Sequence, residues 1–364
     1  MNPSSWQAAK RVLCVRLDYM GDVLMCTPAL RALRQAVPGR EITLLTSAGG
    51  AAVAGMIPEV DRSLVWPAPW MKNSIAHEPA LDFEMLARLR QENFDAAVIF
   101  TTYSQSALPA AMACYLAGIG LRLAHCRENP YQLLSDWVPD PEPDKCLRHE
   151  VQRQLDLVAA IGASCDNQKL SFAVPAEATE WASRQLRELE MPAQWVLLHP
   201  GASAASRRYP AASWSAVADL LVEQGLPVLF SGSADEAGLI EGIRADMRGD
   251  SISLAGALDL GRLGALIAAA PVMVSNNTGP AHLAAALGTP LVDLYALTNP
   301  QHTPWQVASR VLYHMVPCRN CYKSVCPQVH QACLANVKPT EVVQAIRELL
   351  TAPETRTHTE LLQA

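Results

Sequence analysis

Residues 12–22 read VLCVRLDYMGD, a continuous apolar run that ends in a short polar loop containing a glycine. A helix is expected to follow at about residues 23–37, and a second apolar strand at residues 41–45 (EITLL). A strand that is apolar along its whole length is typical of a parallel sheet buried on both faces. This strand–loop–helix–strand unit therefore predicts an α/β fold with a ligand loop at the end of its first strand.

The same pattern continues through two arrays separated by a change of composition at residues 170–192. In the first array we expect strands at residues 60–66 and 94–100, helices at 81–92, 107–117 and 147–161, and a loop-rich stretch between the last two helices. In the second we expect strands at residues 195–201, 227–233, 251–256, 272–276 and 290–296, with helices at 211–224, 236–247, 260–270, 280–287 and 340–350. Two successive arrays predict two Rossmann-like, doubly wound domains facing a cleft. We place them at residues 1–172 and 173–350, followed by a flexible tail at 351–364.

Composition and charge exclude several classes of protein. Half of the 364 residues are hydrophobic and 18% are charged, which is typical of a globular chain. The net charge of −6 comes without a block of Lys and Arg, so a nucleic-acid groove is not expected. No apolar stretch has the length of about 18 residues that a transmembrane helix needs, and the N-terminus lacks a signal-peptide core. We expect a cytoplasmic protein whose ten cysteines are mostly reduced.

The loop at residues 18–22 is the first candidate site. Gly21 allows a tight turn or a close approach to a ligand. Asp22 is expected at a helix N-terminus, where it is either an N-cap or a catalytic base. Asp18 is open to the same two interpretations. The loop lacks the GxGxxG pattern, so no dinucleotide fingerprint is present here.

The second candidate site is the loop at residues 199–210 (HPGASAASRRYP), which follows an apolar strand. It combines Gly201 and small residues such as Ser203 with the paired Arg207 and Arg208. Guanidinium groups donate paired, charged hydrogen bonds to phosphates and carboxylates. The loop therefore predicts an anion site that includes Ser203 and Arg207, the alternative being a solvated loop with surface arginines.

The third candidate site is at residues 275–290, where a strand ends and a helix is expected to begin at Pro280. Unpaired amide groups of Thr278, Gly279 and Ala281 would point out of the helix start and bind a diphosphate. The Thr278 hydroxyl adds a donor. His282, one turn further on, either contacts the phosphate or packs structurally.

A cysteine cluster with the pattern C-x2-C-x4-C-x6-C occupies residues 318–333. Its members are Cys318, Cys321, Cys326 and Cys333, and His330 lies between the last two. A structural zinc or iron ion is one interpretation, and a disulfide or packed thiols are the alternatives. Four thiolate ligands would close the metal's coordination shell, so no catalytic role is implied.

Taken together, three segments carry a resemblance that spans most of the chain. They are RLDYMGDVLMCTPALRALR (residues 16–34), HPGASAASRRYPAASW (199–214) and SNNTGPAHLAAALGTPLVDLYALTNP (275–300). The chain resembles the family 9 glycosyltransferases, the ADP-heptose:lipopolysaccharide heptosyltransferases. The resemblance implies the GT-B fold, with the acceptor-binding domain first and the nucleotide-sugar domain second. It also implies an inverting transfer that requires no cofactor or catalytic metal.

The resemblance also implies roles for individual residues. Asp22 matches the carboxylate proposed as general base, and Arg207 lies where the family often has Lys and would neutralise the departing diphosphate. The segment Thr278, Gly279 and Pro280 matches the phosphate loop. Asn277 replaces an Asp of the family and leaves the identity of the sugar open. The remaining donor contacts implied are Gly21, Ser203, Asp235, Glu236, Leu258 and His282.

The expected partners are ADP-heptose and a lipopolysaccharide or related glycan acceptor. We expect the protein to bind peripherally to the inner membrane or to be free in the cytoplasm. Three alternatives remain open at this point. The enzyme could use another nucleotide sugar or modify a protein. The chain could bind a sugar nucleotide without catalysis. The cysteine cluster could define a metal or redox protein.

Overall fold

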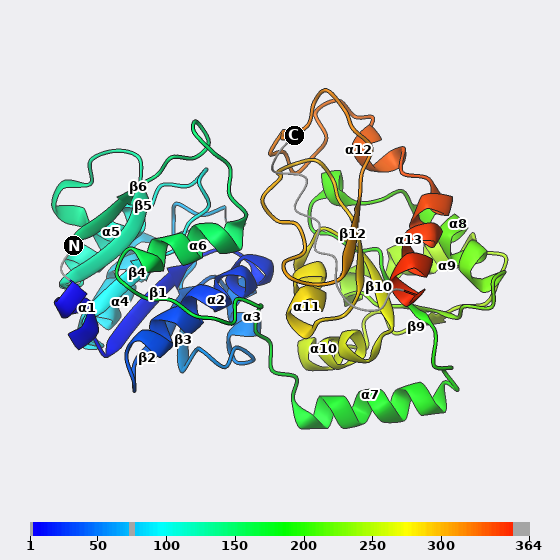
Figure 1. Cartoon of the computed structure of the whole chain (residues 1–364), viewed down its shortest axis with the longest axis horizontal. Coiled ribbons are helices and arrows are strands. Elements are labelled where there is room, and N and C mark those ends of the chain that lie inside the picture. Colours follow the sequence, from blue (N-terminus) through cyan, green and yellow to red (C-terminus); the bar gives the residue numbers. More distant parts are fainter. Residues whose placement is uncertain (1–2, 73–76, 352–364) are drawn as a thin grey trace. The chain divides into compact units, whose positions relative to one another are not determined.

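The computed structural model describes residues 3–72 and 77–351, so the tail expected at residues 351–364 lies outside these residues except for Thr351. The chain divides into two compact units, Met1–Ala173 and Val174–Ala364, each of which is described by itself (Figure 1). Among the described helices, none combines the length and the apolar content needed to cross a lipid bilayer.

The first unit is a parallel sheet with helices on both faces. Its strands are β1 (Arg11–Arg16), β2 (Glu41–Thr46), β3 (Arg62–Val65), β4 (Ala96–Ile99), β5 (Leu121–Cys126) and β6 (Asp136–Pro139). Its helices are α1 (Pro3–Ala8), α2 (Met20–Ala36), α3 (Ala48–Ala54), α4 (Pro79–Gln91), α5 (Leu108–Leu116), α6 (Glu150–Ala159) and the 3₁₀ turn η1 (Tyr131–Leu133). The strand order β3-β2-β1-β4-β5-β6 reverses direction between β1 and β4. That reversal is the switch point at which doubly wound sheets bind ligands.

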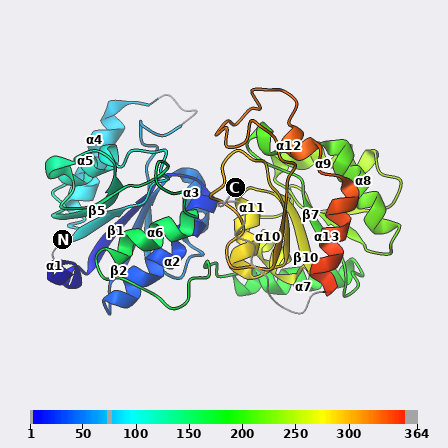
Figure 2. The same cartoon turned by 45° about the horizontal axis from the view of Figure 1, so that its top comes forward.

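Apolar side chains bury both faces of this sheet. Val12 and Leu13 are completely buried in β1, which pairs with β2 on one side and β4 on the other. Helices α2 and α6 pack together on one face, and α4 and α5 pack together on the other, as Figure 2 shows. This two-sided burial explains why the residues of β1 between Arg11 and Arg16 are all apolar.

Helix α2 begins at Met20, three residues earlier than the sequence pattern predicts. Tyr19 is its N-cap, so Gly21 and Asp22 belong to the first turn of the helix instead of the loop. The helix also contains Pro28, which has no amide hydrogen to donate. The hydroxyl of Thr27 donates to the carbonyl of Leu24 at 2.7 Å, and this bond occupies the acceptor that a residue other than proline at position 28 would use.

Strands β5 and β6 lie in the stretch that the sequence analysis assigned to loops, and that assignment is wrong. Strand β5 was not predicted because Arg122 and His125 interrupt its apolar pattern, although both side chains are buried. The Arg122 guanidinium donates to the carbonyls of Leu133, at 2.7 Å, and Gly120, at 2.9 Å. A buried charge that is satisfied by distant backbone cannot be recognised from local sequence.

The second unit repeats the same architecture. Its strands are β7 (Val196–His199), β8 (Val228–Phe230), β9 (Ile252–Ser253), β10 (Val272–Asn276), β11 (Leu291–Leu294) and β12 (Ser309–Leu312). Its helices are α7 (Ala176–Glu188), α8 (Ala211–Val222), α9 (Ala237–Ala245), α10 (Leu260–Ala269), α11 (Gly279–Leu287), α12 (Ala332–Ala335), α13 (Pro339–Thr351) and the 3₁₀ turns η2 (Ala205–Arg207) and η3 (Ala234–Glu236). The strand order β12-β11-β10-β7-β8-β9 places the switch point between β7 and β10.

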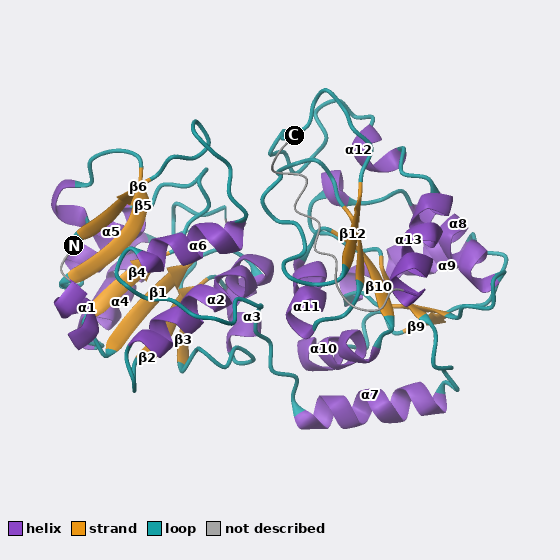
Figure 3. Ribbon diagram, viewed as in Figure 1, coloured by secondary structure: helices purple, strands orange, loops and turns teal. Residues whose placement is uncertain are grey.

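Helices cover both faces of the second sheet. Helices α8, α9 and α13 pack on one face, and α7, α10 and α11 form the layer on the other. Helix α10 starts at Asp259, whose carboxylate accepts from the amide of Arg262, and α11 ends at Gly288 in the left-handed conformation. Figure 3 shows the long irregular connection from β12 to α12, which contains three of the four clustered cysteines.

Candidate active site

The loop after β1 and the first turn of α2 bring Asp18 and Asp22 to the switch point of the first sheet. Asp22 is the third residue of α2, and its Oδ1 accepts from Nη2 of Arg16 at 3.0 Å. Because Tyr19 is the N-cap, the interpretation of Asp22 as the cap of this helix is wrong. The Asp22 side chain is 22% exposed, and no hydrogen bond to its second oxygen occurs among the described residues. Its carboxylate is therefore available to a ligand.

Arg16 is the residue that organises this corner of the unit. Its completely buried guanidinium lies 2.9 Å from Asp18 Oδ2, 3.0 Å from Asp22 Oδ1 and 2.8 Å from Glu150 Oε1. The Asp18 contact is an ion pair without hydrogen-bond geometry, whereas the other two are hydrogen bonds. Sequence reasoning missed Arg16 and Glu150. The available signal was an arginine that directly follows the apolar run at residues 12–15 in strand β1.

Burial raises the pKa of two acids of this cluster, Asp18 and Glu150, and repulsion between the carboxylates adds to the rise. Burial raises the pKa of Asp18, the charge of Arg16 opposes that rise, and the charge of Asp22 adds to it. Burial likewise raises the pKa of Glu150, with Arg16 again opposing. One cation thus faces three carboxylates in a poorly solvated place, an arrangement common in catalytic sites and also found in structural ion-pair networks.

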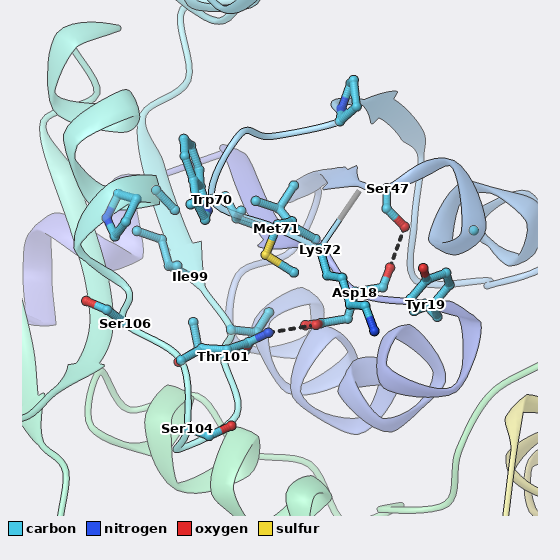
Figure 4. A pocket seen from close by; sticks show the side chains of 18 of the residues that line it. Asp18, Tyr19, Ser47, Trp70, Met71, Lys72, Ile99, Thr101, Ser104 and Ser106 are labelled. Carbon is cyan, nitrogen blue, oxygen red and sulfur yellow. Dashed lines mark hydrogen bonds between the residues drawn. The ribbon is translucent and has the colours of Figure 1, made fainter. Parts of the chain in front are cut away.

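A cavity of about 580 Å³ opens beside this cluster, at the carboxyl ends of β1 and β4 (Figure 4). Its lining is mainly apolar and includes Trp70, Met71 and Ile99, with Asp18 and Lys72 as charged groups. The amide of Gln105 donates to Asp18 Oδ1 at 2.7 Å, which fixes this carboxylate on the cavity wall. The lining includes Asp18 but not Asp22. A mostly apolar pocket with a few fixed polar groups suits one small, partly polar ligand such as a sugar.

The second unit brings two of the predicted loops together at its own switch point. The side chain of Asn276, the last residue of β10, accepts from the amide of Tyr209 at 3.0 Å and donates to the carbonyl of Pro200 at 2.7 Å. The loop after β7 is thereby bound to the loop that starts α11. The predicted anion-binding segments are neighbours, because one buried amide bridges them.

The start of α11 carries polar atoms without partners. Thr278 is the N-cap but makes no side-chain cap, and its buried hydroxyl oxygen has no hydrogen-bond partner among the residues that the structure describes. Asn277 is 2% exposed, and neither polar atom of its amide makes a hydrogen bond of good geometry, although it lies near the hydroxyl of Tyr295. Buried polar atoms of this kind usually have a partner that is a ligand or a water molecule.

Two of the three backbone amides that were expected to be unpaired at this helix start make no bond to a backbone carbonyl among the described residues. These two are the amides of Thr278 and Gly279. The amide of Ala281 donates to the carbonyl of Thr278 at 3.1 Å, so the expectation that it is unpaired is wrong. Pro280 lies in the first turn, and His282 is buried with its ring 6.3 Å from that of His302.

The two arginines of the loop after β7 differ in their contacts. Arg208 donates to the carbonyl of Ala202 at 2.8 Å and so supports the loop. Arg207 ends η2 and is half-buried, and its guanidinium makes no hydrogen bond or ion pair with other described residues. Ser203 is exposed in the same loop. Arg207 is therefore the guanidinium that remains available to an anion.

Asp293, on β11, was missed because it stands in an apolar strand. It is completely buried, and neither carboxyl oxygen has a hydrogen-bond partner among the described residues. Burial raises its pKa well above the ordinary value, and Arg207 opposes this rise. Burial therefore favours the protonated form of Asp293, whereas the charge of Arg207 favours the ionised form.

The remaining predicted donor contacts lie on two further loops. Glu236 accepts from the amide of Ser233 at 2.9 Å in a capping box, so its carboxylate is partly engaged within η3. A side chain at Gly201 would overlap that carboxylate, which explains the glycine. Asp235 is exposed in η3, and Leu258 is half-buried just before α10.

The cysteine cluster does not form a metal centre in the described residues. All ten cysteines of the chain are free, and no group of three or more His, Cys, Asp or Glu residues within residues 3–72 and 77–351 has the arrangement needed to hold a metal. Cys318 and Cys333 pack against Tyr295, Leu297 and Val316. The amide of Ala332 donates to Nδ1 of His330 at 2.9 Å, which occupies that nitrogen. The expectation of a structural zinc or iron ion at Cys318, Cys321, Cys326 and Cys333 is thus unsupported, and so is a disulfide.

Solved structures share this fold over nearly the whole chain. A family 9 glycosyl transferase from Veillonella parvula DSM 2008 matches with a TM-score of 0.78 at 20% identity, covering 94% of this chain and 97% of that one. The E. coli ADP-heptose lps heptosyltransferase II matches with a TM-score of 0.72 at 23% identity, covering 93% and 98%. The two doubly wound units therefore have the GT-B fold.

The sequence itself gives the family. The chain belongs to glycosyltransferase family 9 (heptosyltransferase), because the sequence model of that family matches residues 83–332. Among curated relatives, lipopolysaccharide heptosyltransferase 1 of Pseudomonas aeruginosa is 26% identical over 367 aligned residues, covering 95% of this chain and 99% of the relative. The family resemblance expected from the three sequence segments is confirmed.

Proposed function

We propose that this glycosyltransferase moves a heptose from ADP-heptose to a lipopolysaccharide or related glycan acceptor. The observation that carries the proposal is family membership together with a full-length match to a lipopolysaccharide heptosyltransferase. The name of the structurally similar E. coli enzyme gives ADP-heptose as its donor. The paired switch-point sites supply the groups that such a reaction needs.

The second unit is proposed to hold the donor. The amides of Thr278 and Gly279 and the positive end of α11 attract the diphosphate, and the guanidinium of Arg207 adds charged hydrogen bonds. The buried amide of Asn277 gains a partner when a sugar hydroxyl reaches it. Asp235, Glu236 and Leu258 then surround the nucleoside, and Ser203 and His282 complete the donor contacts.

The first unit is proposed to hold the acceptor, with Asp22 as general base and the cavity beside Asp18 as the sugar pocket. Gly21, buried in the first turn of α2, leaves room for substrate close to the helix start. In the reaction Asp22 takes the proton of the acceptor hydroxyl, and the hydroxyl oxygen bonds to the anomeric carbon with inversion. The bond from that carbon to the diphosphate breaks, and ADP leaves with the electron pair. Arg207 and the helix start stabilise the growing negative charge.

Asn277 supports one alternative, because an amide replaces a carboxylate at the expected sugar contact. A screen of ADP-heptose, other ADP-sugars and UDP-sugars tests both versions by thermal stabilisation and by release of free nucleotide. The proposal expects the largest stabilisation and the fastest release with ADP-heptose. Preference for another sugar, transfer to a protein, or stabilisation without release would replace it with the corresponding alternative.

We also propose that the protein works in the cytoplasm and binds peripherally to the inner membrane. Ten free thiols suit a reducing compartment. The neighbouring elements α4, α5 and η1 expose Phe83, Tyr115 and Tyr131, at 71%, 47% and 80%. Exposed apolar groups of this kind often mark an interaction surface. Co-sedimentation with anionic phospholipid vesicles should fall in Phe83→Ser, whereas Val329→Ser, an 86% exposed control in the second unit, should bind normally.

A further inference from the structure

Arg16 has the geometry of a device that orients the proposed base. Its side chain is completely buried at the end of β1, and its Nη2 hydrogen-bonds only one of the two oxygens of Asp22. The other oxygen, Oδ2, has no partner among the described residues and belongs to a side chain that is partly exposed. A base must present an oxygen within hydrogen-bond reach of the hydroxyl that it deprotonates. Arg16 therefore fixes one oxygen and leaves the other for the acceptor.

Glu150 holds Arg16 in place from a different element. It is the first residue of α6 and is completely buried, and its Oε1 accepts from Arg16 Nη1 at 2.8 Å and from Gln154 Nε2 at 2.7 Å. The amide of Gln154 donates further to the carbonyl of Thr101, which lines the cavity. The orientation of Asp22 on α2 is thus connected through one guanidinium to α6 and to the cavity wall.

The charges around Arg16 do not balance. Asp18, Asp22 and Glu150 all approach this one guanidinium. Cys26, on α2, faces the same cluster as a thiol, and its Sγ donates to the carbonyl of Asp22. Arg153, on α6, is the second cation near Glu150, but it pairs with Asp140 and Glu142. Removing one negative charge from this set must therefore change how strongly the others hold a proton.

We propose that Arg16 and Glu150 form a positioning pair that orients Asp22 and tunes the pH range in which it accepts a proton. This inference rests on the proposed role of Asp22 as general base. Arg16 touches no substrate in it and acts only through the carboxylates. Glu150 supplies the charge that ties Arg16 to α6, while Asp18 shares the guanidinium at the cavity wall.

The test compares Glu150→Gln with Glu142→Gln in the full chain. Both residues are completely buried glutamates that pair with arginine, but Glu142 pairs with Arg148 and Arg153 and not with Arg16. Glu150→Gln keeps the shape and an acceptor oxygen while it removes one charge. We expect it to move the acid limb of kcat for transfer from ADP-heptose to lower pH by about one unit, with the KM for donor unchanged. Glu142→Gln should leave that limb in place.

A second variant and a second readout separate this inference from the proposed function. Arg16→Lys keeps the charge but cannot reach three carboxylates, so kcat should fall about tenfold or more with little change in KM. The titration of Asp18, followed by carbon-13 NMR and assigned with Asp18→Asn, reports the charge balance without any turnover. Its midpoint should fall in Glu150→Gln and stay unchanged in Glu142→Gln.

Each outcome has one meaning. Equal acid limbs in both glutamine variants, or wild-type kcat in Arg16→Lys, would overturn the positioning pair. So would an unchanged Asp18 midpoint in Glu150→Gln. Absence of transfer from ADP-heptose by the wild-type enzyme would instead overturn the proposed function, and the Asp18 titration would still decide whether Arg16 and Glu150 act as a coupled pair.

Discussion

The switch points of the two units differ in how their buried polar groups are paired. In the first unit, Asp18, Asp22 and Glu150 all have a partner in one buried guanidinium. In the second, Asn277, Thr278 and Asp293 have buried polar atoms without hydrogen bonds in the described part of the chain. The first arrangement is organised before any ligand arrives, whereas the second is completed by one. A base needs a fixed orientation, and a donor site gains selectivity when only the correct ligand satisfies its polar groups.

The largest effect should come from Asp22→Asn. The amide cannot accept the proton of the acceptor hydroxyl, so kcat should fall by about 10²–10⁴-fold while the donor binds as before. Nucleotide release and calorimetric binding of ADP measure the two quantities. Asp144→Asn, an exposed change in the same unit, is the control. Near-normal turnover in Asp22→Asn would remove the first unit from the chemistry.

Removal of Arg16 should cost stability where removal of an exposed arginine should not. Arg16→Ala leaves buried carboxylates without their cation, and we expect a loss of about 3–5 kcal/mol in the free energy of unfolding of the first unit. Arg62→Ala breaks an exposed pair with Glu92, with about 0–1 kcal/mol expected. Urea unfolding of both variants provides the comparison. Equal losses would mean that the first site is no better organised than the surface.

The two arginines after β7 test the proposed donor site, because only one of them is expected to bind the diphosphate. Arg207→Ala removes the available guanidinium, and kcat/KM should fall about 10²-fold. Arg208→Ala loses only a bond to the carbonyl of Ala202, so it should lower the Tm slightly and leave kcat/KM close to normal. Steady-state kinetics on both variants decides between them. If the Arg208 variant lost more activity, the assignment of the anion-binding arginine would be reversed.

The smallest effect concerns the buried acid of the second unit. Burial raises the pKa of Asp293, so its contribution to stability is complete below the unfolded value of about 4 and is lost as pH rises toward the folded value. Asp293→Asn removes that loss. It should stabilise the protein by about 1 kcal/mol at pH 8, or about 2–4 °C in Tm, and by less at pH 5. Thermal melts of both proteins across this range measure the difference, and a gain that did not grow with pH would contradict the raised pKa of Asp293.

Local signals in the sequence predicted the second site better than the first. A strand end and a helix start are both predicted by the short segment Thr278, Gly279 and Pro280, and β10 and α11 are found there. The helix start at Asp22 was placed too late, because the cap is a tyrosine that makes no side-chain cap. The three-dimensional partners of Asp22 could not be predicted, since Glu150 meets Arg16 across 134 residues of chain.

Charged residues inside apolar strands were the main source of error. Arg122 in β5 and Asp293 in β11 are each buried among hydrophobic neighbours. Arg122 donates to backbone carbonyls, whereas the Asp293 carboxyl has no hydrogen-bond partner among the described residues. Local sequence cannot distinguish these two fates, because the partners or their absence depend on the tertiary arrangement. The cysteine spacing illustrates the converse, since its four thiols do not form a metal-binding group within the described residues.

The amide of Asn276 has a consequence for how the second unit can evolve. Its two hydrogen bonds hold the backbone at Pro200 and Tyr209 in a fixed place relative to the end of β10. Insertions or deletions between those two residues would therefore have to preserve the positions of both anchors. Within that frame, an exposed residue such as Ser203 can change without disturbing either anchor, so new nucleotide or sugar preferences can arise by exchange of side chains on a loop whose ends are fixed.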